Sequence, residues 1–252
     1  MLLKKSGRFK RIITIILVII FWLAVWQIVS MIVNQSLFMP SPIETFASLG
    51  GLLSTSDFWL SVAYTFYRVV FGLALSFISG IALAYLASRW SALENLLGPV
   101  VAAVKSTPVM SIIVLALVWF SASFVPVFSC VLLCFPIFYT NTLTGIKSVD
   151  RELLEVAFVF NVRRRRIITQ ISIPSVLPHV YSALSVCLGF SWKSVVAAEV
   201  LSSPKYSMGF KLYATKLYLD TSGLFAWTIT IIIVSLIVEK GLKRILPKGN
   251  SL

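Results

Sequence analysis

The stretch 155–174, EVAFVFNVRRRRIITQISIP, holds four consecutive arginines, Arg163–Arg166, in a chain that is otherwise mostly hydrophobic. The 252 residues are 58% apolar and 12% charged, and their mean hydropathy is +0.94. Soluble domains are about 25% charged, so this composition indicates a protein whose solvent is a lipid bilayer. A net charge of +13 would favour nucleic acid for a soluble chain, but cytoplasmic loops of membrane proteins also concentrate Lys and Arg.

Six apolar stretches are approximately long enough to cross a bilayer, for which a helix needs ~20 mostly apolar residues. They are residues 12–33, 69–87, 100–120, 124–144, 178–201 and 224–239. The first is expected to be a span rather than a cleaved signal peptide, because it is long and lacks a small-residue cleavage site. The sequence therefore predicts an all-α polytopic membrane protein, with a single transmembrane domain over residues 1–252.

The positions of the Lys and Arg residues predict the orientation. Sixteen of the 22 lie in segments that are cytoplasmic if the N-terminus is cytoplasmic, against four on the outer side, while Lys105 and Lys193 lie within spans. This bias follows the positive-inside rule and predicts that both termini are cytoplasmic. It also places the arginine run in a cytoplasmic loop, residues 145–174, because one arginine at a helix centre costs ~2.5–3.5 kcal/mol.

Within this loop the pattern predicts two short helices joined by a sharp turn. Asp150 or Ser148 is suited to cap a helix that begins near Arg151, and apolar residues follow at helical spacing, giving that helix one apolar side. Asn161 comes next, and Asn is the best residue type after Gly for the left-handed conformation that ends helices. A second helical stretch, 162–171, is expected to end at Pro174.

The spacing in this loop resembles the cytoplasmic loop of ABC importer permeases, which reads Glu-Ala-Ala, three residues, Gly, nine residues, Ile-x-Leu-Pro. Here Glu155-Val156-Ala157 is followed by three residues, Asn161, nine residues and Ile171-Ser172-Ile173-Pro174. Asn replaces the family's Gly but can still adopt the left-handed turn. Similarity to the nitrate/sulfonate/taurine branch extends over nearly the whole chain, through Met39-Pro40-Ser41-Pro42, Thr65, Arg68, Gly72, Pro108, Trp192, Ala197-Ala198-Glu199, Asp220-Thr221 and Phe225-Ala226.

This resemblance implies the type I importer fold, in the cell membrane of a prokaryote, and transport by alternating access. It implies three partners: a second copy of the chain, an extracytoplasmic substrate-binding protein, and an ATPase subunit that receives the 145–174 loop in a groove. The expected docking residues are Glu155, Ala157, Asn161, Arg163, Arg164, Ile171 and Pro174. Whether the arginines contact the ATPase or only lipid headgroups stays open.

The chain contains no G-x-x-x-x-G-K-[ST] phosphate loop, so ATP is expected to bind and be hydrolysed in the separate subunit. The dispersed acids form no carboxylate pair or metal-spaced cluster, which argues against an enzyme and against a metal site. No cofactor is expected in this chain. Its three cysteines lie in apolar runs and are interpreted as small buried hydrophobes.

Two residues of the fifth span, Trp192 and Glu199, are seven apart and share a helix face, which favours a place in the pathway or at an outer gate. Lys193 has three interpretations: it attracts an anionic solute, pairs with an acid on a neighbouring helix, or extends outward to the interface. Lys105 is expected to reach the cytoplasmic face, because it follows Pro99 closely. Residues 204–223 are consistent with an interfacial helix or a plain connector.

Small residues recur every four positions along the second span, at Gly72, Ser76, Gly80 and Ala84. Such a ladder lets another helix approach closely, either within the chain or across a dimer face. Prolines at 108, 126 and 136 are expected to kink their spans.

The favoured function is the permease subunit of an ATP-driven, binding-protein-dependent importer. The alternatives are a secondary transporter or channel that needs no ATPase, for which the sequence shows no convincing internal repeat, and a nucleic-acid-binding membrane protein, which rests on composition alone. The solute is predicted to be small and nitrate-, sulfonate- or taurine-like, with Lys193 favouring an anion, or alternatively a vitamin precursor.

Overall fold

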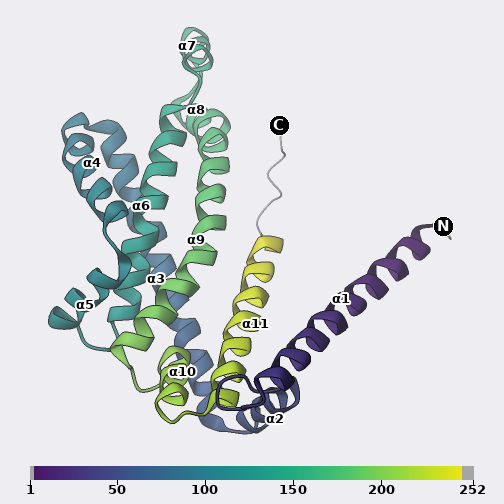
Figure 1. Ribbon diagram of the computed structural model, residues 1–252. Helices are drawn as coiled ribbons and strands as arrows, with labels where there is room; N and C mark the ends of the chain where they lie inside the picture. Colours follow the sequence, from purple (N-terminus) through teal and green to yellow (C-terminus); the bar gives the residue numbers. More distant parts are fainter. Residues whose placement is uncertain (1–2, 246–252) are drawn as a thin grey trace. The chain divides into compact units, whose positions relative to one another are not determined.

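The computed structural model describes the backbone of residues 3–245 and the side chains of residues 13–241, and within this part the chain is helical, without strands (Figure 1). The Lys and Arg residues near the two ends of the chain, which support the predicted orientation, lie largely outside the residues whose side chains are described. The helices are α1 Leu3–Val33, α2 Pro42–Leu53, α3 Ser56–Arg89, α4 Ser91–Ser106, α5 Val109–Trp119, α6 Val125–Lys147, α7 Arg151–Val159, α8 Arg164–Ile167, the π-helical turn η1 Ile168–Ser172, α9 Ile173–Ser202, α10 Met208–Leu217 and α11 Thr221–Ile245. The all-α prediction is confirmed.

Five helical segments are long and apolar enough to cross a membrane: 13–33, 56–89, 125–147, 164–202 and 221–241. The predicted span 100–120 is not one helix, because α4 and α5 meet at a bend of 107°. Pro108 has no N–H to continue a helix, and it disfavours helical geometry at Thr107, whose ψ is 133°. The α4–α5 pair is either one broken span, which would be the sixth in the structure, or a re-entrant loop. The last predicted span, 224–239, begins earlier than expected, at Thr221.

The prediction that a helical stretch ends at Pro174 was wrong. Helix continues from Arg164 through η1 into α9 without a break. Pro174 lies in the first turn of α9, directly after the wider π-helical turn. The change of hydrogen-bond pattern at this π-helical turn coincides with the N–H that Pro174 lacks, so the residue that usually stops a helix is accommodated.

The described chain divides into two compact units, which we describe separately. The first contains residues up to Trp59 together with Lys211–Ile231. In it the Trp26 indole donates to the carbonyl of Pro40 at 3.0 Å and stacks on Phe225 at a centroid distance of 5.6 Å. These contacts join α1 to the turn before α2 and to the start of α11. The expectation of one domain over residues 1–252 stays a prediction.

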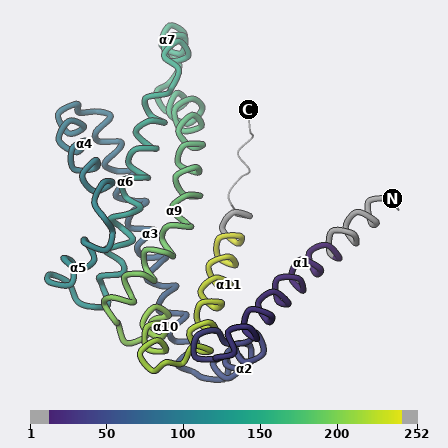
Figure 2. The backbone as a smooth tube through the Cα atoms, viewed as in Figure 1, coloured from purple at the N-terminus to yellow at the C-terminus, as the bar shows by residue number. Residues whose placement is uncertain are grey.

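The second unit contains Leu60–Phe210 and the residues from Ile232 onward, and its centre is the pair α6 and α9, which run side by side (Figure 2). Ser129 and Ser194 share a hydrogen bond of 2.6 Å between these helices. Cys134 and Cys187 each donate a thiol to the other's carbonyl, at 3.8 and 3.7 Å. The three cysteines are buried and free, as predicted.

The small-residue ladder of α3 packs against α6 within the chain. A Cβ on Gly72 would lie 2.8 Å from Cys130 Cβ, and one on Gly80 would lie 2.6 Å from Phe138 Cβ. Ser76 is fully buried, and Ala84 belongs to a buried cluster that also contains Tyr139. Intrachain packing therefore accounts for these small residues, because a side chain at either glycine would force the two helices apart.

Candidate functional site

The segment between α6 and α9 contains α7, which lies beyond the ends of these two helices (Figure 1). Asp150 caps α7 by accepting a hydrogen bond from the Glu152 N–H at 2.8 Å, as the sequence predicts. Asn161 ends the helix with a φ of +49°, which confirms the predicted left-handed turn. The Asn161 N–H bonds to the Phe158 carbonyl and the Val162 N–H to that of Ala157, the paired arrangement of a Schellman motif.

This helix exposes an apolar surface although it lies outside every apolar span. We define the α7 surface as Leu153, Val156, Phe158, Val159 and Phe160, all of which are exposed; Phe158 reaches 81%. An exposed apolar cluster of this kind marks a site of contact with another molecule.

The predicted docking residues differ in accessibility. Glu155, Asn161, Arg163, Arg164 and Pro174 are exposed, Ile171 is half-buried and Ala157 is buried. Ala157 therefore supports the α7 turn through its carbonyl rather than presenting a side chain. Within the described part of the chain, none of the four consecutive arginines has an acidic partner, so the run is free to contact another surface.

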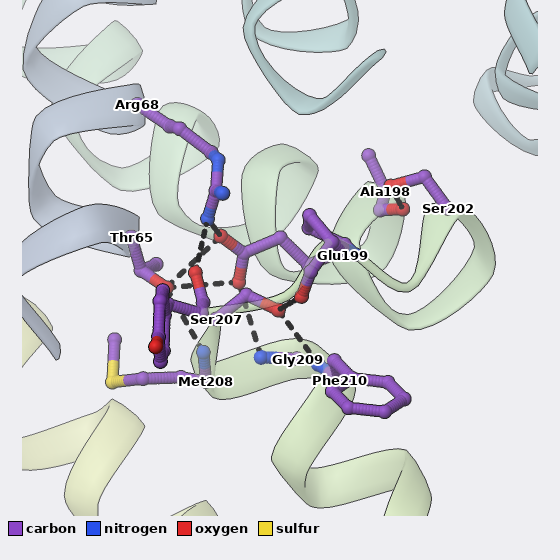
Figure 3. A network of polar contacts seen from close by, with 11 residues as sticks. Thr65, Arg68, Ala198, Glu199, Ser202, Ser207, Met208, Gly209 and Phe210 are labelled. Carbon is purple, nitrogen blue, oxygen red and sulfur yellow. Dashed lines mark hydrogen bonds and ion pairs between the residues drawn. The ribbon is translucent and has the colours of Figure 1, made fainter. Parts of the chain in front are cut away.

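A second site lies inside the second unit, where Arg68 of α3 meets Glu199 of α9 (Figure 3). The side chains are almost fully buried, with 6% and 0% exposed. Arg68 Nη1 donates to Glu199 Oε1 at 2.8 Å and to the carbonyl of Tyr206 at 2.8 Å. The guanidinium thus joins α3 to both the end of α9 and the turn that follows it.

The Glu199 carboxylate also holds the start of α10 (Figure 3). Its Oε2 accepts from the Gly209 N–H at 3.1 Å, and the Thr65 hydroxyl lies 2.9 Å from its Oε1 while accepting from the Met208 N–H at 3.0 Å. Gly209 is required here, because a Cβ would lie 2.5 Å from the Val196 carbonyl oxygen. We call Thr65, Arg68, Glu199, Met208 and Gly209 the Glu199 network; it fixes three helices to one another.

The three residues predicted for the pathway do not all share one face of α9. Trp192 and Glu199 lie on the buried face of α9, and the Trp192 indole N–H has no partner among the described residues. Lys193 is exposed between buried neighbours, so it points away from this face. Pathway or gate roles for the three residues stay predictions. Sequence reasoning missed the pairing of Arg68 with Glu199, although two opposite charges inside apolar helices are a usable signal.

Two other expectations concern the loop after α9 and metal sites. Within 204–223, residues Met208–Leu217 form α10, with Phe210 and Tyr213 half-buried and Leu217 exposed, and a place at the membrane interface stays a prediction. Among the described residues there is no group of three or more His, Cys, Asp and Glu placed to hold a metal ion.

Comparison with known proteins identifies the class of this chain. Residues 72–248 match the family described as binding-protein-dependent transport system inner membrane component. A putative aliphatic sulfonates transport permease of Bacillus subtilis is 24% identical, over 86% of this chain and 79% of its own length. A nitrate import permease of Synechococcus elongatus is 26% identical (79% and 75%), and a formylaminopyrimidine transport permease of Halalkalibacterium halodurans is 27% identical (91% and 90%).

The fold is similar to solved importer structures. A bacterial ABC transporter that imports the acidic polysaccharide alginate has a chain with a TM-score of 0.64 and 17% identity, covering 98% of this chain and 99% of that one. A second structure of a bacterial alginate transporter, in complex with a pentasaccharide-bound periplasmic protein, has a chain with a TM-score of 0.55 and the same identity, covering 96% of this chain and 97% of that one. At this identity the likeness concerns the fold alone.

Proposed function

Because this chain belongs to the binding-protein-dependent transport system inner membrane component family, we propose that it forms the solute pathway of an importer whose energy comes from a separate ATPase subunit docked on the α7 surface. The chain is a multi-pass inner-membrane permease and not itself an enzyme. ATP binds to the partner, and this chain needs no cofactor of its own.

The observation that carries this proposal is the geometry of α7. Its apolar residues, exemplified by Phe158 at 81% exposed, lie outside the candidate spans, and the rest of the described chain leaves them uncovered. The Asp150 cap and the Asn161 turn hold the helix at both ends. A short, rigid helix with an apolar face suits insertion into a groove, because little conformational entropy is lost on docking.

The remaining partners follow from the family. We propose a homodimer in the membrane, with both termini and the 145–174 loop on the cytoplasmic side. An extracytoplasmic binding protein delivers the solute, in keeping with the family's description as a binding-protein-dependent transport system. The described part of α1 is largely exposed, which fits lipid or a second copy around it.

The proposed solute is small. The related permeases are named for aliphatic sulfonates, nitrate and formylaminopyrimidine, none of which is a polymer. A vitamin precursor is the alternative to a nitrate-, sulfonate- or taurine-like solute.

The test is uptake by proteoliposomes that contain this chain, its cognate ATPase and its binding protein. Uptake should require ATP inside the vesicles and should stop when the ATPase carries a substitution of its phosphate-loop lysine. Uptake that continues without the ATPase, or that an ion gradient alone drives, would overturn the proposal in favour of a secondary transporter.

A further inference from the structure

A cavity of about 210 Å³ lies beside the break between α4 and α5, within the second unit. Apolar residues of these helices and of α6 form most of its lining, with Thr107 and Ser129 as neutral polar groups. Of the residues that line it, Lys105 alone carries a charge. Drug-sized ligands occupy pockets of about 300–1,000 Å³, so this space suits a smaller molecule.

Lys105 lies deeper in the helix than its distance from Pro99 suggests. Helix α4 begins at Ser91, so Lys105 is about 21 Å along it at 1.5 Å per residue. Its Nζ contacts Thr140 of α6, which is seven residues, or about 10 Å, before Lys147. Because Lys147 pairs with Glu94 of α4, Lys105 contacts α6 well before the end at which this ion pair joins the two helices. The expected reach of Lys105 to the cytoplasmic face stays a prediction.

The ammonium group of Lys105 has spare hydrogen-bonding capacity. A lysine carries three N–H donors, and the contact to the Thr140 hydroxyl, at 3.3 Å, uses one of them. Lys105 has no acidic partner among the described residues. It is also not needed to cap α4, because the hydroxyls of Ser106 and Thr107 already donate to the carbonyl of Ala103.

The surroundings of this cation favour a negative ligand. The first turn of α5 carries no acidic residue, and Pro108 offers it no side-chain cap. Val109 and Ile112 of that turn line the cavity, so the positive end of the α5 dipole adds to the charge of Lys105. Charged side chains within membrane segments face a bundle interior or a cavity rather than lipid, and Lys105 lines such a cavity.

We infer that this cavity is a solute station of the transport pathway, where Lys105 binds the negatively charged group of a small oxyanion such as a nitrate or a sulfonate. The inference rests on the proposed importer function and narrows its substrate class. It assigns the anion preference to Lys105 rather than to Lys193, which lies on α9 and does not line the cavity.

The binding test uses bromide as the probe, with the purified permease in lipid nanodiscs, both alone and with its ATPase. Bromide binding is followed by the broadening of its NMR line, and sodium ethanesulfonate is added as a competitor. Wild type and Lys105→Arg should broaden the line, and ethanesulfonate should reverse the effect. Lys105→Gln should weaken binding about tenfold or more, because a charged donor is lost, whereas Lys193→Gln should match wild type.

The outcomes separate this inference from the function on which it rests. Equal bromide binding by wild type and Lys105→Gln, or loss of binding in Lys193→Gln alone, would overturn the Lys105 assignment even if ATP-driven uptake is normal. Failure of ATP-driven uptake in the wild-type importer would overturn the proposed function, while bromide binding still reports on the cavity. Size-exclusion chromatography of each variant establishes that it remains folded.

Discussion

Arg68 Nη1 lies 2.8 Å from Glu199 Oε1, so that a buried ion pair joins α3 to α9 across 131 residues of sequence. The same carboxylate accepts from the first turn of α10, and the guanidinium also binds the Tyr206 carbonyl. The end of α9, the start of α10 and this part of α3 are therefore expected to move together when the transporter changes conformation.

Breaking this pair from one side should destabilise the protein strongly. In Arg68→Gln the Glu199 carboxylate keeps its burial but loses its counter-charge, which costs about 3–5 kcal/mol in other proteins. We expect a clearly lower thermal midpoint for Arg68→Gln and for Glu199→Gln in nanodiscs. The double variant should have a thermal midpoint only slightly below that of Arg68→Gln. A loss of stability equal to the sum of the two single losses would contradict coupling between the residues.

Gly209→Ala should disrupt the start of α10. The added methyl would lie 2.5 Å from the Val196 carbonyl oxygen, so α10 must shift away from α9 and lengthen the Gly209 N–H contact to Glu199. A lower thermal midpoint and reduced uptake are expected. Gly189→Ala is the matched control, because a Cβ there has nothing within 4 Å; equal effects of the two changes would exclude the steric explanation.

The left-handed turn at Asn161 should determine the orientation in which α7 meets the ATPase. Asn161→Gly keeps access to a φ of +49°, whereas Asn161→Val is opposed by about 1–2 kcal/mol or more, since valine is β-branched. Co-purification with the ATPase should survive the first change and weaken with the second. Similar retention of the ATPase by both variants would show that the turn is not needed for docking.

Charge reversal on α7 tests the docking surface directly. Glu155→Arg replaces an exposed acid within the family motif and should weaken ATPase association without affecting membrane insertion. Phe158→Ser removes the most exposed side chain of the α7 surface and should act in the same direction. Arg165→Gln, also exposed but outside the motif, serves as the control; if it alone released the ATPase, docking would depend on the arginine run instead.

Local chemistry made much of the loop predictable. The Asp150 cap and the Asn161 turn depend on side chains that act on the backbone within a few residues, so one sequence suffices to expect them. The apolar spans are equally readable, because a bilayer demands long uncharged helices. Pro174 misled the prediction, because the π-helical turn directly before it changes the hydrogen-bond pattern where its N–H is missing, so the helix continues past it.

Sequence by itself determined that this chain is a helical membrane protein, where most of its spans lie, and that the 145–174 segment carries a capped helix ended by a left-handed turn. Only the tertiary structure decided which buried charges meet, how sharply α4 and α5 bend, and that Lys105 rather than Lys193 borders a cavity. The physical reason is range: caps and hydropathy act within a few residues, whereas the Arg68–Glu199 pair and the cavity exist only once distant helices have packed.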